Sequence, residues 1–156
     1  MNELQVITNF LATSVLCGLM GLSLMTAVIS FARRFEPVAV GPVRAVGSLF
    51  TGSMESAKAF GWLVHFAASM AFGMLYTFLL MSVTPPFEIL YLPLSIAIGA
   101  AHGFFVFFLL IPSLAEHHPI AAVREQGGAI GLVYVFAHIA YGAGVGAMFL
   151  ALSSVV

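Results

Sequence analysis

The fold is decided by apolar stretches such as Ala129-Ile-Gly-Leu-Val-Tyr-Val-Phe-Ala-His138-Ile-Ala-Tyr-Gly-Ala-Gly-Val-Gly146-Ala-Met-Phe-Leu-Ala-Leu152, which continues to Val156. This stretch contains no acidic residue, no lysine and no arginine. About 20 apolar residues are enough for a helix to cross the hydrocarbon core of a bilayer. Because lipid offers no partner for backbone N–H and C=O groups, a segment of this kind crosses as an α-helix.

Three further stretches have the same character, over about residues 7–32, 59–83 and 89–114. Together with 129–156 they predict an all-α polytopic membrane protein, a four-helix transmembrane bundle forming one domain over residues 1–156. Composition agrees, because 62% of the 156 residues are hydrophobic and only 7% are charged. Soluble domains carry about a quarter of charged residues, so a water-soluble globule is excluded.

The basic residues predict the orientation of the bundle. Four of them lie in the connection 33–58 and the fifth, Arg124, lies between the third and fourth helices. The positive-inside rule therefore places both connections in the cytoplasm and both termini outside. The connection 33–58 also predicts a short amphipathic segment in the membrane interface, with Arg44 facing lipid headgroups. A net charge of −1 without a basic run excludes nucleic acid as a partner.

An internal repeat relates the second and fourth helices. His65, Gly73 and Tyr76 recur at the same spacing as His138, Gly146 and Phe149. We interpret this as a duplicated helical hairpin whose two copies are related by an axis along the membrane normal.

Polar and small residues form one stripe on each predicted helix. His65, His102 and His138 lie on the stripes of the second, third and fourth helices, and Cys17 and Met20 lie on that of the first. Polar groups in lipid turn toward the interior of a bundle. We therefore expect the three imidazoles to share the centre of the bundle, with Cys17 and Met20 beside them.

Ionisable side chains within a membrane span indicate a functional site. Imidazole binds copper, zinc and iron, and thiolate and thioether ligands favour Cu(I). The predicted ligands of a metal ion are therefore the three intramembrane histidines and their two sulfur neighbours, His65, His102, His138, Cys17 and Met20.

A haem b is the alternative cofactor. His102 and His138 are expected at similar depth and are candidates for its two axial ligands, whereas His65 is expected nearer the cytoplasm. Glycines near these two histidines are expected to make room for the porphyrin: Gly99, Gly103, Gly142 and Gly146.

A second constellation lies between the third and fourth helices, at Glu116-His117-His118. Two imidazoles and a carboxylate are ligand types that a transition metal takes. If the buried histidines bind a metal ion, we expect this triplet to receive it first.

Absences narrow the function. The chain has no Asp, and its Glu residues lie at helix ends or in loops, which disfavours an ion-coupled transporter. No constellation for nucleophilic catalysis and no phosphate-binding loop is present, so we expect a protein that is not an enzyme.

We predict an accessory subunit of a respiratory or metal-handling membrane complex that binds a haem or a copper, zinc or iron ion. The alternative is a structural or assembly subunit whose histidines only join helices, and a small channel or carrier is third. The expected partners are the lipid bilayer and either other membrane subunits or a second copy of the chain.

Two stretches carry a family resemblance, Gly99-Ala-Ala-His-Gly103 and His138-Ile-Ala-Tyr-Gly-Ala-Gly-Val-Gly146. They resemble the Gly-x-x-His-Gly and His-x-x-Tyr-Gly-x-x-x-Gly motifs of small four-helix proteins of the bacterial inner membrane. The likeness covers helices two to four. It implies the fold and the inner-membrane location, and it transfers no activity.

Overall fold

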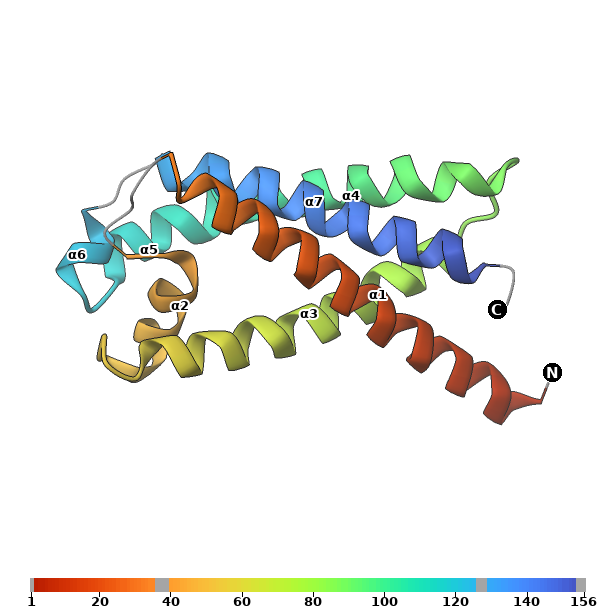
Figure 1. The fold of residues 1–156 in the computed structure, drawn as a ribbon, viewed down its shortest axis with the longest axis horizontal. Coiled ribbons are helices and arrows are strands. Elements are labelled where there is room, and N and C mark those ends of the chain that lie inside the picture. Colours follow the sequence, from red (N-terminus) through yellow and green to blue (C-terminus); the bar gives the residue numbers. More distant parts are fainter. Residues whose placement is uncertain (1, 36–39, 126–128, 154–156) are drawn as a thin grey trace.

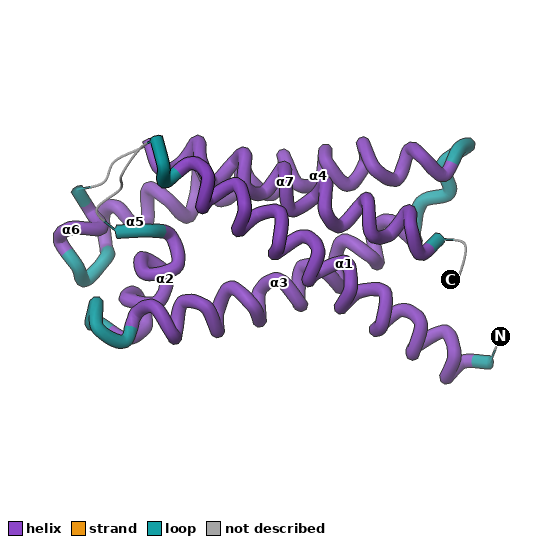
Figure 2. Tube along the Cα trace, in the orientation of Figure 1, coloured by secondary structure: helices purple, strands orange, loops and turns teal. Residues whose placement is uncertain are grey.

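The computed structural model describes residues 2–35, 40–125 and 129–153, and these contain helices and no strand, which confirms the predicted all-α class (Figures 1 and 2). A short 3-10 turn, Glu88–Leu90, leads into α4, and a π-helical segment, Val106–Leu110, joins α4 to α5. The α-helices are α1 Glu3–Ala32, α2 Pro42–Thr51, α3 Ala57–Met81, α4 Tyr91–Phe105, α5 Ile111–His117, α6 Ala121–Arg124 and α7 Ala129–Leu152.

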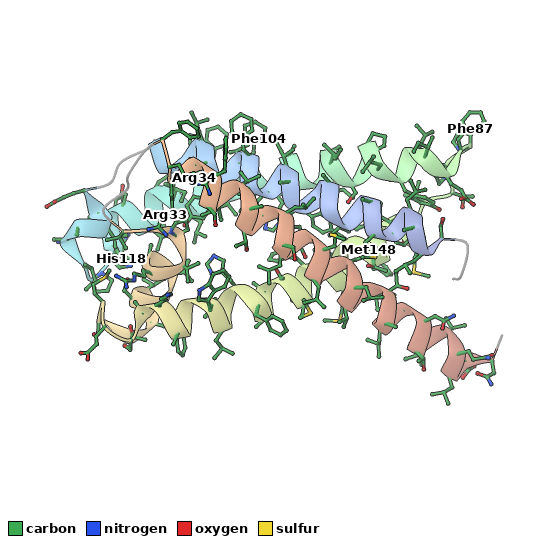
Figure 3. The ribbon with its side chains drawn as sticks, in the orientation of Figure 1. Arg33, Arg34, Phe87, Phe104, His118 and Met148 are labelled. Atoms are coloured by element: carbon green, nitrogen blue, oxygen red, sulfur yellow. The ribbon has the colours of Figure 1, made fainter. Side chains whose placement is uncertain are left out.

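Four helical spans are long and apolar enough to cross a membrane, as predicted: Glu3–Ala32, Ala57–Met81, Glu88–His117 and Gly131–Leu152. The chain is therefore an integral membrane protein with four candidate spans. Large apolar side chains remain exposed along them, as on the outer face of α4, where Figure 3 shows Phe104. In a bilayer these side chains meet acyl chains.

The first span begins at Glu3, earlier than expected, because its start is capped. The Asn2 side chain accepts the Gln5 backbone N–H at 2.8 Å, and the Gln5 side chain accepts the Asn2 N–H at 3.2 Å. This reciprocal pair satisfies two N–H groups that would otherwise lack a helical partner.

The third span continues through a proline. Pro112 has no N–H, and its ring crowds the carbonyl of Phe108 one turn earlier. The π-helical segment Val106–Leu110 lies directly before it, where the helical frame must widen. The helix therefore runs on to His117, beyond the expected end near residue 114.

The helices form an open arc. α1 packs against both α3 and α7, and α7 packs against α4, whereas α3 makes few contacts with α4 or α7. The order around the arc is thus α3, α1, α7, α4, as Figure 1 shows. The side between α3 and α4 stays open.

Small residues bring α4 and α7 into close contact. A Cβ atom added to Gly99 would lie 2.5 Å from the carbonyl oxygen of His138, and one added to Gly142 would meet the carbonyl oxygen of Ser95. The Ser95 hydroxyl also donates to the Gly142 carbonyl at 2.7 Å. Close backbone approach and interhelical hydrogen bonds are the usual basis of helix association in lipid.

Helices α1 and α3 also pack closely through small residues. A Cβ atom on Gly18 would lie 2.6 Å from the Ser69 carbonyl oxygen, and one on Gly73 would lie 2.6 Å from that of Ser14. The offset in sequence that relates His65 to His138 also relates two α3 residues to two α7 residues. These pairs are Ser69 with Gly142 and Gly73 with Gly146. The shared packing supports the interpretation of a duplicated hairpin.

The two ends of the bundle differ in charge. The start of α1 and the end of α7 lie at one end, and α2, α5 and α6 lie at the other, called here the α2 end (Figure 1). Ser153 at the first end donates a hydrogen bond to Glu88 at 3.3 Å. All five basic residues lie at or near the α2 end: Arg33, Arg34, Arg44, Lys58 and Arg124. That this end faces the cytoplasm stays a prediction.

A helix forms within the connection 33–58, of which residues 36–39 lie outside the described part. The helix, α2, packs against the start of α3, where a Cβ atom on Gly47 would meet the carbonyl oxygen of Ala57. Ser48 of α2 is fully buried. The expected interfacial segment thus packs onto the bundle and covers one end of it.

Candidate cofactor site

An apolar cavity of about 580 Å³ lies between α3 and the α4–α7 pair. Its few polar groups are mainly imidazoles and phenols. His65 reaches it from α3, His102 from α4 and His138 from α7. The structure thus brings the three intramembrane histidines to one cavity, on the open side of the arc.

Two of these rings have a defined tautomer. His65 Nδ1 lies 2.9 Å from the carbonyl oxygen of Gly61, and His138 Nδ1 lies 2.7 Å from that of Tyr134. A carbonyl oxygen only accepts, so in each ring Nδ1 carries the proton and donates. Nε2 of each neutral ring then keeps a free lone pair. Histidines that bind metals are oriented by this kind of bond from the other ring nitrogen.

His65 and His138 are equivalent positions of the repeat. Each ring is held by the carbonyl one turn earlier, and Gly61 and Tyr134 are themselves related by the same spacing. Because α3 begins at Ala57, His65 stands nearly as many residues from the start of its helix as His138 does in α7. His65 and His138 therefore lie at more similar depths than the sequence predicted.

His102 is held differently. Its Nδ1 lies 3.2 Å from the Tyr76 hydroxyl, and its ring centre lies 4.1 Å from that of Phe72. Both partners belong to α3. The edge of the ring also meets His138 of α7, with centres 4.5 Å apart. His102 therefore acts in this structure as a contact that joins three helices.

The expected pairing of His102 and His138 across a porphyrin does not fit this geometry. Two axial imidazoles with metal–nitrogen bonds of about 2 Å have ring centres about 6 Å apart, with the porphyrin plane between them. The two rings here are in direct contact at 4.5 Å. No macrocycle can lie between them in this arrangement.

The four glycines expected to make room for the porphyrin are covered by the opposite helix. A Cβ on Gly103 would lie 3.0 Å from the Cα of Val135, and one on Gly146 would lie 3.1 Å from the Cα of Leu92. Gly99 and Gly142 are equally close to α7 and α4, as described above. All four serve the contact between α4 and α7.

The sulfur ligands expected beside the histidines lie elsewhere. Cys17 is fully buried in the core of the bundle, and Met20 is 36% exposed on the surface, and neither lines the cavity. Across residues 2–35, 40–125 and 129–153, no group of three or more His, Cys, Asp or Glu side chains could hold a metal ion.

The triplet Glu116-His117-His118 is not assembled as one site. His118 is buried, and its Nε2 donates to the Ala45 carbonyl at 2.9 Å while its Nδ1 accepts the Ile120 N–H at 3.0 Å. Figure 3 shows this side chain beside α2. Glu116 and His117 instead are largely exposed. His118 joins α2 to the turn after α5, with both ring nitrogens engaged.

A second cavity, of about 340 Å³, adjoins the first and was not expected from the sequence. We call it the basic cavity, because Arg33, Arg44 and Lys58 line it. Met25 and His65 line both cavities. One signal was present in the sequence, because Lys58 lies two helical turns before His65 and hence on the same face of α3.

No protein family model, no curated protein and no solved structure matches this chain. The fold and the site therefore define the class, a four-helix integral membrane protein with a histidine-lined cavity on the open side of its arc.

Proposed function

We propose that the chain binds a haem b within the membrane through His65 and His138. One observation carries the proposal: two imidazoles on different helices both have Nδ1 tied to a carbonyl, and both line one cavity. The ligand pair differs from the one expected from sequence, because His138 is retained and His65 takes the place of His102.

The chemistry of the cavity favours a haem over a bare metal ion. None of the described residues that line the cavity is acidic, so a divalent ion there would lack compensating charge. A porphyrin supplies two negative charges to its own iron and presents a large apolar surface. The cavity volume of about 580 Å³ also lies within the usual range for cofactor sites.

Two imidazole ligands suit a haem that passes single electrons. If His65 and His138 both held the iron, such a haem would supply one-electron transfer and would have no open site for oxygen or a substrate. The chain's own groups would hold the iron and exclude water from it. We therefore propose an accessory subunit of a respiratory membrane complex, with bacterial inner membrane as the location and the α2 end in the cytoplasm.

Absorption spectroscopy of the purified protein tests the proposal. We expect a Soret band at about one haem per chain, either as isolated or after addition of haemin. His65→Ala and His138→Ala should each lose the six-coordinate spectrum. His102→Phe, which keeps a ring of similar volume, is the matched control and should retain the spectrum.

Adding free imidazole distinguishes loss of an iron ligand from loss of the haem through misfolding. An exogenous imidazole should restore the six-coordinate spectrum of a folded His65→Gly variant. A folded wild-type protein that stays colourless with haemin, or alanine variants with unchanged spectra, would overturn the proposal.

The second candidate is a structural or assembly subunit. The contacts of His102 with Phe72, Tyr76 and His138 favour it, because this imidazole already acts as a link between helices. Under that account the protein takes up no haem, and each histidine substitution only lowers the free energy of unfolding, by about 1 kcal/mol.

A further inference from the structure

The basic cavity brings together positive charges from three elements. Arg33 follows the end of α1, Arg44 lies in the first turn of α2, and Lys58 lies in the first turn of α3. Within the described part of the chain, none of these three side chains forms an ion pair with a carboxylate. All three side chains are exposed, so they are accessible to a bound anion.

The start of α2 adds to this positive character. Its first residue, Pro42, has no N–H, so only the next N–H groups of the first turn lack a partner within the helix and can attract an anion. The Arg33 guanidinium lies against the same point, because a Cβ atom on Gly41 would be 3.3 Å from Arg33 Nη1.

The two cavities adjoin at His65. Because His65 and Met25 line both, a molecule bound to His65 in the apolar cavity would lie next to the cavity that the three cations line. The matching ligand has an apolar body and acidic groups on one edge. A haem has this shape, since its two propionates extend from one edge of the macrocycle.

We infer that the basic cavity holds the propionate carboxylates of the haem, so that its acidic edge points to the α2 end. This inference rests on the proposed function. Carboxylate oxygens would accept hydrogen bonds from Arg33, Arg44 and Lys58, which are charge-assisted and hence stronger than bonds between neutral groups.

The test compares iron protoporphyrin IX with its dimethyl ester. Both compounds offer the same iron and ring to the histidines, and only the free acid offers carboxylates. In an uncharged detergent, we expect the wild-type protein to bind the free acid at least about tenfold more tightly than the ester.

Substitutions in the basic cavity test whether it causes the preference for the free acid over the ester. The triple variant Arg33→Gln, Arg44→Gln, Lys58→Gln should bind both porphyrins with nearly equal affinity, while keeping the six-coordinate spectrum. Arg34→Gln is the matched control, because Arg34 neighbours Arg33 and does not line the cavity. It should keep the wild-type preference.

The outcomes separate the two claims. If neither porphyrin binds, the proposed function itself fails. If both bind the wild-type protein equally, or if the triple variant keeps the preference for the acid, the inference about the basic cavity is wrong. Phosphorus analysis adds one more outcome. Loss of co-purified phosphatidylglycerol from the triple variant, with an unchanged acid preference, would assign the cavity to a lipid headgroup instead.

Discussion

At the scale of single residues, histidines of this chain differ in what their ring nitrogens contact. His65 and His138 each donate one proton to a carbonyl of their own helix and keep a free nitrogen. His118 has both nitrogens bonded. Residue type and spacing show which side chains can bind a metal. Only the structure shows the hydrogen-bond partners, which determine which ring nitrogen remains available to bind a metal.

His118 gives a prediction for stability. His118→Ala removes a buried hydrogen bond to the Ala45 carbonyl, which keeps the Ser48 hydroxyl as a donor at 3.2 Å. It also removes the partly buried bond from the Ile120 N–H, which then loses its side-chain partner. We expect the free energy of unfolding to fall by about 1 to 3 kcal/mol. Thermal unfolding in detergent, followed by circular dichroism, measures the loss.

The matched control is His117→Ala, the exposed neighbour, which should unfold like the wild-type protein. Equal stability of the two variants would show that His118 does not link α2 to the turn after α5.

At the scale of helices, hydropathy predicted the four spans because length and apolar composition alone determine them. It did not predict how they pack. The polar stripes predicted four inward faces around one axis, whereas the backbones of α3 and α4 stay apart and His102 spans the gap to Phe72 and Tyr76. Met20 therefore lies at the surface, and Gly99 lies against α7 instead of against a cofactor. The start of α3 at Ala57, which brings His65 level with His138, depends on contacts with α2.

Gly99 tests the packing of α4 on α7. A Cβ atom there would lie 2.5 Å from the carbonyl oxygen of His138, and that atom belongs to backbone, which cannot move without shifting the helix. We expect Gly99→Ala to lower the free energy of unfolding by about 1 to 3 kcal/mol, measured by thermal unfolding.

Ala97→Leu is the control on the same helix, because Ala97 is exposed on the outer surface of the bundle. It should leave stability unchanged. A Gly99→Ala protein as stable as the wild type would mean that α4 and α7 are further apart than described.

At the scale of the whole molecule, the open arc and the distribution of charge belong together. The apolar cavity lies between α3 and the α4–α7 pair, where the arc has few contacts, and the basic cavity lies at the α2 end, where the basic residues are. The sequence located those cations and the histidines. It could not show that two cavities meet at His65, because that depends on how α1, α2 and α3 converge.

Electron paramagnetic resonance of the haem-loaded ferric protein tests the central claim most directly, because the signal reports how many strong axial ligands the iron has. We predict a low-spin signal for the wild-type protein, a high-spin signal for both His65→Ala and His138→Ala, and an unchanged low-spin signal for His102→Phe. A low-spin signal that survives in both alanine variants would contradict the claim that these two histidines hold the iron between α3 and α7.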